Sequence, residues 1–170
     1  MGKPRMPARR TSAAARGRGV QPGERSDVLV KGGGHMSSFT TEEIAYLRGQ
    51  RLGRLATVNA AGEPHVTPVG FRYNAENDTI EIGGHGIAAT RKYRDAGRGG
   101  MVAFVVDDVP SPPPWRPRGI EIRGRGEALS EGGKAIMADF DDELIRIAPA
   151  RIISWGIEAG GTRRYARDVR

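Results

Sequence analysis

The alternation of hydrophobic and polar residues between positions 54 and 73 is typical of a β-hairpin. A first apolar run at 55–58 is followed by turn residues at 59–63, where Gly62 is free to take a positive φ. In the second run, 65–73, the odd-numbered residues share one face of the strand and the even-numbered residues share the other. Pro68 lies in this run and has no backbone N–H for a neighbouring strand. We therefore expect a missing strand partner or a bulge at Pro68, with room there for a ligand.

Four further apolar runs predict β-strands. They lie at 79–83, 101–106, 119–129 and 144–157. In the first of them Glu81 stands between two isoleucines, which is typical of a half-buried strand, and Pro149 predicts a bulge or bend in the last. Few of the strands are separated by a crossover helix long enough for a parallel sheet. The sequence therefore predicts a mainly β fold with short α-helices, built as a six-stranded antiparallel barrel.

Helices are expected in three places. Thr40 and Glu43 form a capping box, which predicts a helix over 41–48. The segment 87–98 follows a glycine-rich turn in helical register, and 130–140 is expected to be helical despite its two glycines.

The net charge of +7 is concentrated at the N-terminus. Residues 1–35 hold eight Lys and Arg against two Asp and Glu, whereas residues 36–170 have a net charge of only +1. The first segment is rich in Arg, Gly, Pro, Ala and Ser, which predicts a disordered basic arm. A misassigned start, with Met36 as the true first residue, and a leader peptide are alternative explanations. We expect a folded domain at 36–158 and a polar tail at 159–170, and we do not expect nucleic acid as a partner of the near-neutral domain.

The composition restricts the chemistry further. The chain has no cysteine, so disulfides, a thiolate nucleophile and a cysteine zinc site are excluded. No apolar run approaches the roughly 18 residues of a membrane span. We expect a cytoplasmic protein with no membrane partner.

A phosphate site is the best chemical candidate from spacing alone. Backbone amides near Gly83, Gly84 and Gly86 come just before a predicted helix that carries Thr90, Arg91 and Lys92. Amide donors, a helix start and cations in one place suit an anion. The alternative is a solvated basic helix face after an ordinary glycine turn.

Other chemically capable residues give weaker signals. His65 and His85 are too few for a metal site and are read as hydrogen-bonding or structural residues. Ser154 lacks the surroundings of a hydrolase nucleophile. Trp115 and Trp155 could stack on a planar ring, but such residues more often belong to a core or an interface.

Four segments in order along the chain resemble one family. They are RLATVNAAGEPHVTPVGF at 54–71, TRKYRDAGRGGMVAFVV at 90–106, GIEIRGRGEAL at 119–129 and IRIAPARIISWGI at 145–157. Together they resemble the pyridoxamine 5'-phosphate oxidase-like (PPOX class) split-barrel superfamily, and within it the oxidoreductases that depend on coenzyme F-420, an 8-hydroxy-5-deazaflavin. The likeness covers about residues 39–157.

The resemblance implies a six-stranded split barrel that forms a homodimer with cofactor sites at the interface. It places the cofactor ring beside Thr67, Pro68 and Val69, with His65 on the same strand. It places the cofactor phosphate at Gly83, Gly84, His85, Thr90, Arg91 and Lys92. Many relatives carry basic residues where this chain has Ile87 and Ala89, so the charge here would come from Lys92 and Arg94.

The function implied is hydride transfer from reduced F-420 to a small unsaturated organic molecule. The protein's part would be to position the ring and exclude water. No general acid is identified, and His65 and Tyr73 are candidates only. Two alternatives keep the same fold: an FMN-dependent oxidoreductase or flavin-binding protein, and a non-enzymatic cofactor carrier or sensor. Nucleic-acid binding through the basic arm is a further alternative.

Overall fold

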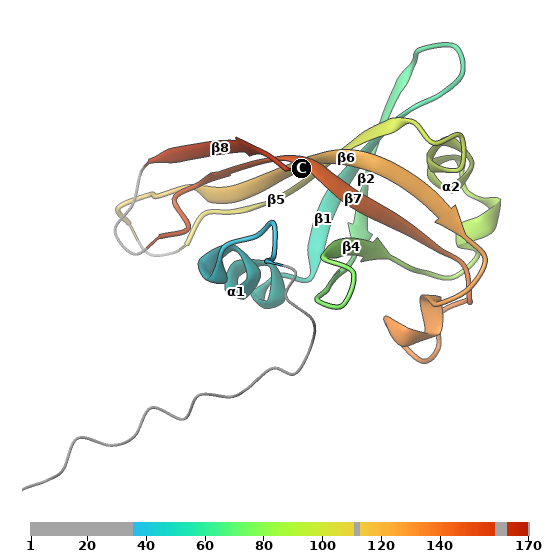
Figure 1. Ribbon diagram of the computed structural model, residues 1–170, viewed down its shortest axis with the longest axis horizontal. Helices are drawn as coiled ribbons and strands as arrows, with labels where there is room; N and C mark the ends of the chain where they lie inside the picture. Colours follow the sequence, from blue (N-terminus) through green and yellow to red (C-terminus); the bar gives the residue numbers. More distant parts are fainter. Residues whose placement is uncertain (1–35, 111–112, 159–162, 170) are drawn as a thin grey trace, which may run out of the picture. The chain divides into compact units, whose positions relative to one another are not determined.

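The computed structural model describes residues 36–110, 113–158 and 163–169 (Figure 1). The predicted basic arm, residues 1–35, lies outside the described residues. The strands of the described part form one antiparallel sheet of eight strands. The antiparallel arrangement was predicted, but the number of strands is two more than the expected six. These strands are β1 (Leu52–Val58), β2 (Pro64–Gly70), β3 (Arg72–Asn74), β4 (Thr79–Ile82), β5 (Met101–Asp108), β6 (Arg118–Leu129), β7 (Leu144–Trp155) and β8 (Arg164–Asp168).

The order of the strands shows why the sheet curls into a half-barrel. The order is β2-β1-β5-β6-β7-β4-β3, with β8 added beside β7. β2 and β3 lie at opposite ends of this order, yet only Phe71 separates them in the chain. The two ends of the sheet must therefore come close together, as in a barrel. The predicted second hairpin strand, 65–73, thus divides into two strands at Phe71.

The inner face of the curled sheet is the hydrophobic core. Leu55, Phe104, Ile122 and Ile152, from β1, β5, β6 and β7, are fully buried. Gly53 on β1 has no side chain because the Phe104 ring lies where one would be: a Cβ there would come within 2.1 Å of the ring. The predicted apolar runs therefore supply one shared core.

The irregularity predicted at Pro149 is confirmed. β6 and β7 pair along their whole length, and their register shifts between Arg123, which faces Arg151, and Gly124, which faces Pro149. One residue of β7 is therefore extra, as in a β-bulge. A Cβ on Gly124 would come within 2.0 Å of the Ala148 carbonyl oxygen, so the strands approach closely beside the bulge.

Of the first two predicted helices, one is confirmed and the other is divided into two elements. α1 (Thr41–Gly49) has the expected capping box, in which the Glu43 amide donates to Thr40 Oγ1 and the Thr40 amide donates to the Glu43 carboxylate. The segment 87–98 is not one helix: a 3₁₀ turn, η1 (Ile87–Ala89), is separated from α2 (Arg91–Ala96) by Thr90 in extended conformation.

The predicted helix at 130–140 was wrong. Only a 3₁₀ turn, η2 (Gly133–Ala135), forms there. Gly132 has φ +106°, and a Cβ on Gly133 would come within 2.1 Å of the Asp141 carbonyl oxygen. The two glycines therefore serve a tight turn against the chain at 141–143, which a continuous helix would not allow.

Residues 164–168, within the predicted polar tail, form β8 against β7, a strand that the sequence pattern did not predict. Apart from Arg167, the side chains of β8 are exposed. Backbone pairing and ion pairs hold the strand, among them Arg151 with Asp168 at 2.6 Å. A strand with so few buried apolar residues carries little periodic signal.

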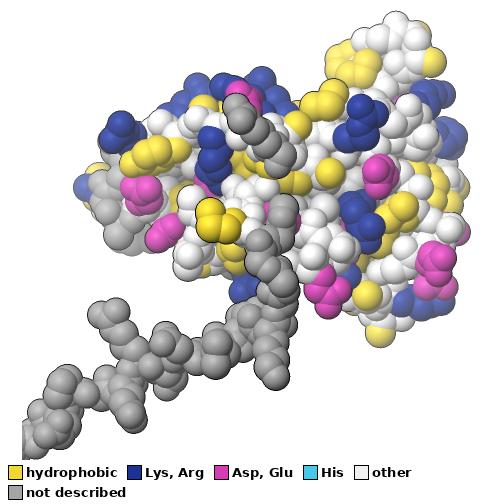
Figure 2. Space-filling model, viewed as in Figure 1, with side chains coloured by type: hydrophobic (Ala, Val, Ile, Leu, Met, Phe, Trp, Pro, Cys, Tyr) yellow, Lys and Arg dark blue, Asp and Glu magenta, His cyan; other side chains and the backbone are white. Residues whose placement is uncertain are grey.

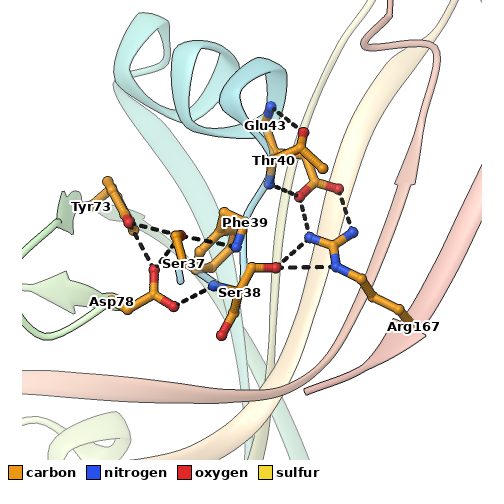
Figure 3. A network of polar contacts seen from close by, with 8 residues as sticks. All are labelled: Ser37, Ser38, Phe39, Thr40, Glu43, Tyr73, Asp78 and Arg167. Atoms are coloured by element: carbon orange, nitrogen blue, oxygen red, sulfur yellow. Dashed lines mark hydrogen bonds and ion pairs between the residues drawn. The ribbon is translucent and has the colours of Figure 1, made fainter. Parts of the chain in front are cut away.

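A polar network links the start of α1 to the β3–β4 turn and to β8 (Figure 3). Asp78, in the turn between β3 and β4, accepts hydrogen bonds from Ser37 Oγ, the Ser38 amide and Tyr73 Oη at 2.6, 2.6 and 2.7 Å. On the other side, Arg167 of β8 donates to the Ser38 carbonyl. It also pairs with Glu43 of α1.

The exposed charges are mixed in sign. Figure 2 shows Lys and Arg side chains interspersed with Asp and Glu on the face in view. None of the helices among the described residues is long and apolar enough for a membrane crossing.

Candidate functional site

β2, which carries the predicted ring-binding residues, is an edge strand. It pairs with β1 on one side and lies at the end of the sheet on the other. Pro68 faces Arg54 of β1 and is exposed. Within the described sheet no strand pairs with β2 on the side away from β1, so the missing partner expected at Pro68 is confirmed. A proline is tolerated on such an edge strand because no further strand needs its N–H.

The side chains of β2 alternate as predicted. Val69 is buried and His65 and Thr67 are half-buried, whereas Val66 and Pro68 on the other face are exposed. The three inward residues therefore belong to the core side of the hairpin. A ligand beside β2 would meet the free backbone edge as well as the side chains of Thr67 and His65.

The loop after β4 holds the predicted glycines in close packing. A Cβ on Gly83 would come within 2.8 Å of the Phe140 ring and 3.0 Å of Ile136. The His85 ring lies edge-on to Phe140, with 5.4 Å between the ring centroids. The Gly84 carbonyl accepts a hydrogen bond from the Asp141 amide at 3.4 Å. The loop thus packs against the segment that follows η2.

Two carboxylates approach this loop, and neither was predicted from the sequence to lie there. Asp141 Oδ2 accepts the Gly86 N–H at 2.5 Å, and Asp139 Oδ2 lies 3.8 Å from His85 Nε2. The Gly86 amide, expected to be free for a phosphate, is therefore already bonded to an anion. An incoming phosphate would also meet two negative charges here.

α2 presents the cations. Thr90 is its N-cap: Thr90 Oγ1 donates to the Ile87 carbonyl at 2.6 Å and accepts the Tyr93 amide at 3.4 Å. Arg91 is exposed and Lys92 is half-buried. Within the described part of the chain neither cation makes a hydrogen bond or an ion pair, in contrast to Arg94, which donates to the Ala89 carbonyl at 2.7 Å. Arg91 and Lys92 are therefore available to a ligand, whereas the Thr90 hydroxyl serves the helix.

The hairpin and α2 come together in the fold. α2 packs against β1, the partner strand of β2, as well as against β6. The cations therefore lie on an element that packs against the hairpin's first strand. The predicted site residues fall into three groups: the β2 residues, the packed glycine loop with His85, and the free cations of α2.

A buried carboxylate lies near the end of β4, just before this loop. Glu81 on β4 is 1% exposed and is held by Arg72, Arg146 and Asn74 at 2.7, 2.8 and 2.9 Å. Arg72 also donates to the Ala135 carbonyl in η2. The expected half-buried face of β4 is instead fully buried, because paired arginines neutralise its one charge.

Two cavities lie elsewhere in the described part. One of about 360 Å³ is bordered by the start of α1, the end of β7 and β8. The other, about 460 Å³, lies beside α1 and includes Tyr46 and Arg118. Neither contains a predicted site residue. The candidate site is made of a strand edge and a helix face.

The curled antiparallel sheet with its short helices defines a split-barrel protein. The chain belongs to the pyridoxamine 5'-phosphate oxidase family, whose model matches residues 39–156. The match spans all but the last of the eight strands.

Individual relatives agree with this assignment. The chain is 48% identical over 132 residues, which are 77% of this chain and 93% of the relative, to the 5a,11a-dehydrotetracycline/5a,11a-dehydrooxytetracycline reductase of Streptomyces rimosus. Its fold is similar to that of a conserved hypothetical protein of Mycobacterium tuberculosis, with a TM-score of 0.54 at 20% identity over 71% of this chain and 86% of that one. An FAD-binding protein of Mycobacterium smegmatis has a TM-score of 0.52 at 19% identity over 75% of this chain and 94% of that one.

Proposed function

We propose that this protein is an oxidoreductase that uses coenzyme F-420 to reduce a conjugated carbon–carbon double bond in a small molecule. The observation that carries the proposal is the 48% identity, over nearly the whole relative, with a reductase of a dehydrotetracycline. The name of that substrate places its double bond between ring carbons 5a and 11a. A fused-ring molecule with such a bond is the substrate class we propose here.

The free groups of the site fit a planar cofactor that carries a phosphate. Arg91 and Lys92 would hold the phosphate, since both cations are unpaired in the described chain. We place the phosphate toward α2 and away from the Gly86 amide, because Asp141 occupies that amide. The ring would lie along the β2 edge at Thr67, Pro68 and Val69.

The chemistry asked of the chain's own residues is modest. F-420 in its reduced form supplies the hydride. The exposed edge of β2 would orient the ring, and the packed loop at Gly83 would fix the distance between ring and phosphate sites. His65, half-buried on the same strand, is a titratable side chain two residues before Thr67.

FMN is the second candidate cofactor. It shares the planar ring and phosphate, and a protein of the same fold binds FAD. The site residues named for F-420 would hold FMN in the same way.

We also propose that the protein works as a homodimer. Register and alternation place Leu52, Val58, Val66 and Met101 on the outer face of β1, β2 and β5, and each is at least half exposed. Hydrophobic side chains are visible on the protruding β1–β2 hairpin in Figure 2. The same face carries the exposed Arg54–Asp107 ion pair. Several exposed apolar side chains on one sheet face are typical of a subunit interface, and a second chain there would enclose the open β2 edge.

A titration tests the cofactor assignment. Purified protein is titrated with oxidised F-420 and, separately, with FMN, and fluorescence gives each Kd. We expect tighter binding of F-420, weakened about tenfold or more in Arg91→Ala and Lys92→Ala because each removes a charge-assisted contact. Arg151→Ala is the control, since Arg151 pairs with Asp168 on β8. Tighter binding of FMN would move the protein to the flavin enzymes, and binding of neither would contradict the proposal.

A further inference from the structure

Two polar side chains face each other across the β1–β2 hairpin. Thr57 of β1 is directly opposite His65 of β2 in the strand register. Side chains at directly opposite positions lie on the same face of the sheet, with Cβ atoms about 4.5–5.5 Å apart. Thr57 and His65 therefore share one small space on the inner face.

Both side chains bring a buried polar atom without a partner. Thr57 is 1% exposed, and its Oγ1 makes no hydrogen bond within the described residues. His65 Nδ1 is buried and unpartnered in the same way, although the residue as a whole is half-buried. Buried polar groups in proteins are almost always hydrogen-bonded, to protein or to ordered water. One small polar group between these two facing atoms would give each of them a hydrogen-bond partner.

We propose that Thr57 is a positioning residue for His65 and acts through one ordered water bound between Oγ1 and Nδ1. The Thr57 hydroxyl donates to this water, and the water donates to Nδ1, which is then an acceptor. In the opposite arrangement Nδ1–H would add a donor hydrogen to those of the hydroxyl and the water without adding an acceptor, so one more hydrogen would be left unpaired beside the apolar core. The neutral imidazole therefore carries its proton on Nε2.

The consequence is a fixed hydrogen-bond donor next to the proposed ring site. With Nδ1 turned inward, Nε2–H belongs to the accessible part of His65, two residues along the strand from Thr67. Its ligand would be an acceptor oxygen, such as a ring carbonyl or an enolate. This last step rests on the proposed function; the tautomer of His65 does not.

The tautomer is measured on the cofactor-free protein by long-range ¹H–¹⁵N correlation of the histidine rings. His35 and His85 supply the other two signals, and His85→Gln and His65→Gln assign them. We expect His65 to be a single Nε2–H tautomer in the wild type and in Thr57→Ser, which keeps the hydroxyl. Thr57→Val, of the same shape but without the hydroxyl, should give a mixture of tautomers or a shifted ring. An Nδ1–H tautomer in the wild type, or a spectrum unchanged by Thr57→Val, would overturn the inference.

A second measurement separates this inference from the proposed function. The Kd for F-420 is compared in Thr57→Val and Thr57→Ser, with near-ultraviolet circular dichroism as the check of folding. We expect weaker binding in the valine variant and restoration in the serine variant. Equal affinities would overturn the donor role of His65. If the wild type binds no F-420, the proposed function fails, while the tautomer measurement still decides the role of Thr57. If Thr57→Val does not fold, Thr57→Ala, which also lacks the hydroxyl, takes its place in the tautomer measurement.

Discussion

Glu81 shows how one residue departs from its sequence pattern. Its place between Ile80 and Ile82 indicates a solvent-facing position, yet Glu81 is buried. The reason is long-range: Arg146, far along the chain on β7, is its direct neighbour in the sheet. Local alternation cannot reveal a partner that only the strand order brings near.

Replacement of this carboxylate should be costly. In Glu81→Gln, the charges of Arg72 and Arg146 lose their shared partner, and we expect about 2 kcal/mol less unfolding free energy, below the range for fully buried pairs because both arginines are partly exposed. Urea denaturation measures it. Glu121→Gln is the matched control, because its Arg123 partner is more exposed, and its loss should stay below about 1 kcal/mol. Equal losses would contradict the account of Glu81.

The same residue predicts a pH dependence. Burial tends to raise the pKa of Glu81, but hydrogen bonds from Arg72, Asn74 and Arg146 outweigh it and hold the pKa below the ordinary 4.5. A lowered pKa in the folded state contributes stability above the unfolded-state pKa, and that stability is lost as the pH falls through the folded pKa. We expect the unfolding free energy to drop below about pH 4.5, less steeply in Glu81→Gln. An identical slope in the two proteins would contradict this.

At the scale of elements, the position of the loop after β4 was predicted, but the residues that pack against it were not. The glycines and the basic helix could be recognised because they are adjacent in sequence. Asp139 and Asp141 come from a segment about 50 residues later, at and just beyond the end of the helix predicted over 130–140. Their approach depends on the tight turn at Gly132 and Gly133, which no hydrophobic period encodes.

These carboxylates should weaken the binding of an anionic cofactor. Asp141→Asn keeps an oxygen that can accept the Gly86 N–H but removes the charge, so we expect about two- to fivefold tighter F-420 binding at low salt, and a smaller gain at high salt. Fluorescence titration at two ionic strengths measures it. Asp168→Asn, on β8, should have no effect. An unchanged Kd in Asp141→Asn would contradict a phosphate site on α2 that is close enough to Asp141 to be repelled by it.

At the scale of the whole molecule, most of the fold could be predicted. Six strands, the antiparallel class, the capping box and the bulge at Pro149 all follow from local patterns. The break at Phe71 and the exposed strand β8 do not, because sheet closure and ion pairs decide them. In the candidate site, the edge at β2 and the cations of α2 could be predicted from the sequence. Thr57 could not, because it has the pattern of an ordinary core residue of a strand.

The outer apolar face predicts the assembly. Val66 is 61% exposed in the single chain, so Val66→Lys should leave the chain folded but disrupt a dimer that buries this face. Sedimentation velocity should show a dimer for the wild type and a monomer for the variant. Val109→Lys, at an exposed position after β5, should remain dimeric. A monomeric wild type, or a dimeric Val66→Lys, would contradict the proposed interface.

The central claim is that this split barrel transfers hydride from a deazaflavin to a conjugated double bond. The most direct measurement mixes the protein with chemically reduced F-420 and a dehydrotetracycline without oxygen, and follows the return of oxidised F-420 absorbance. The account predicts reoxidation that depends on both protein and substrate, with a product heavier by two hydrogens. F-420 that binds but stays reduced, or reduction of the substrate only with reduced FMN, would contradict it.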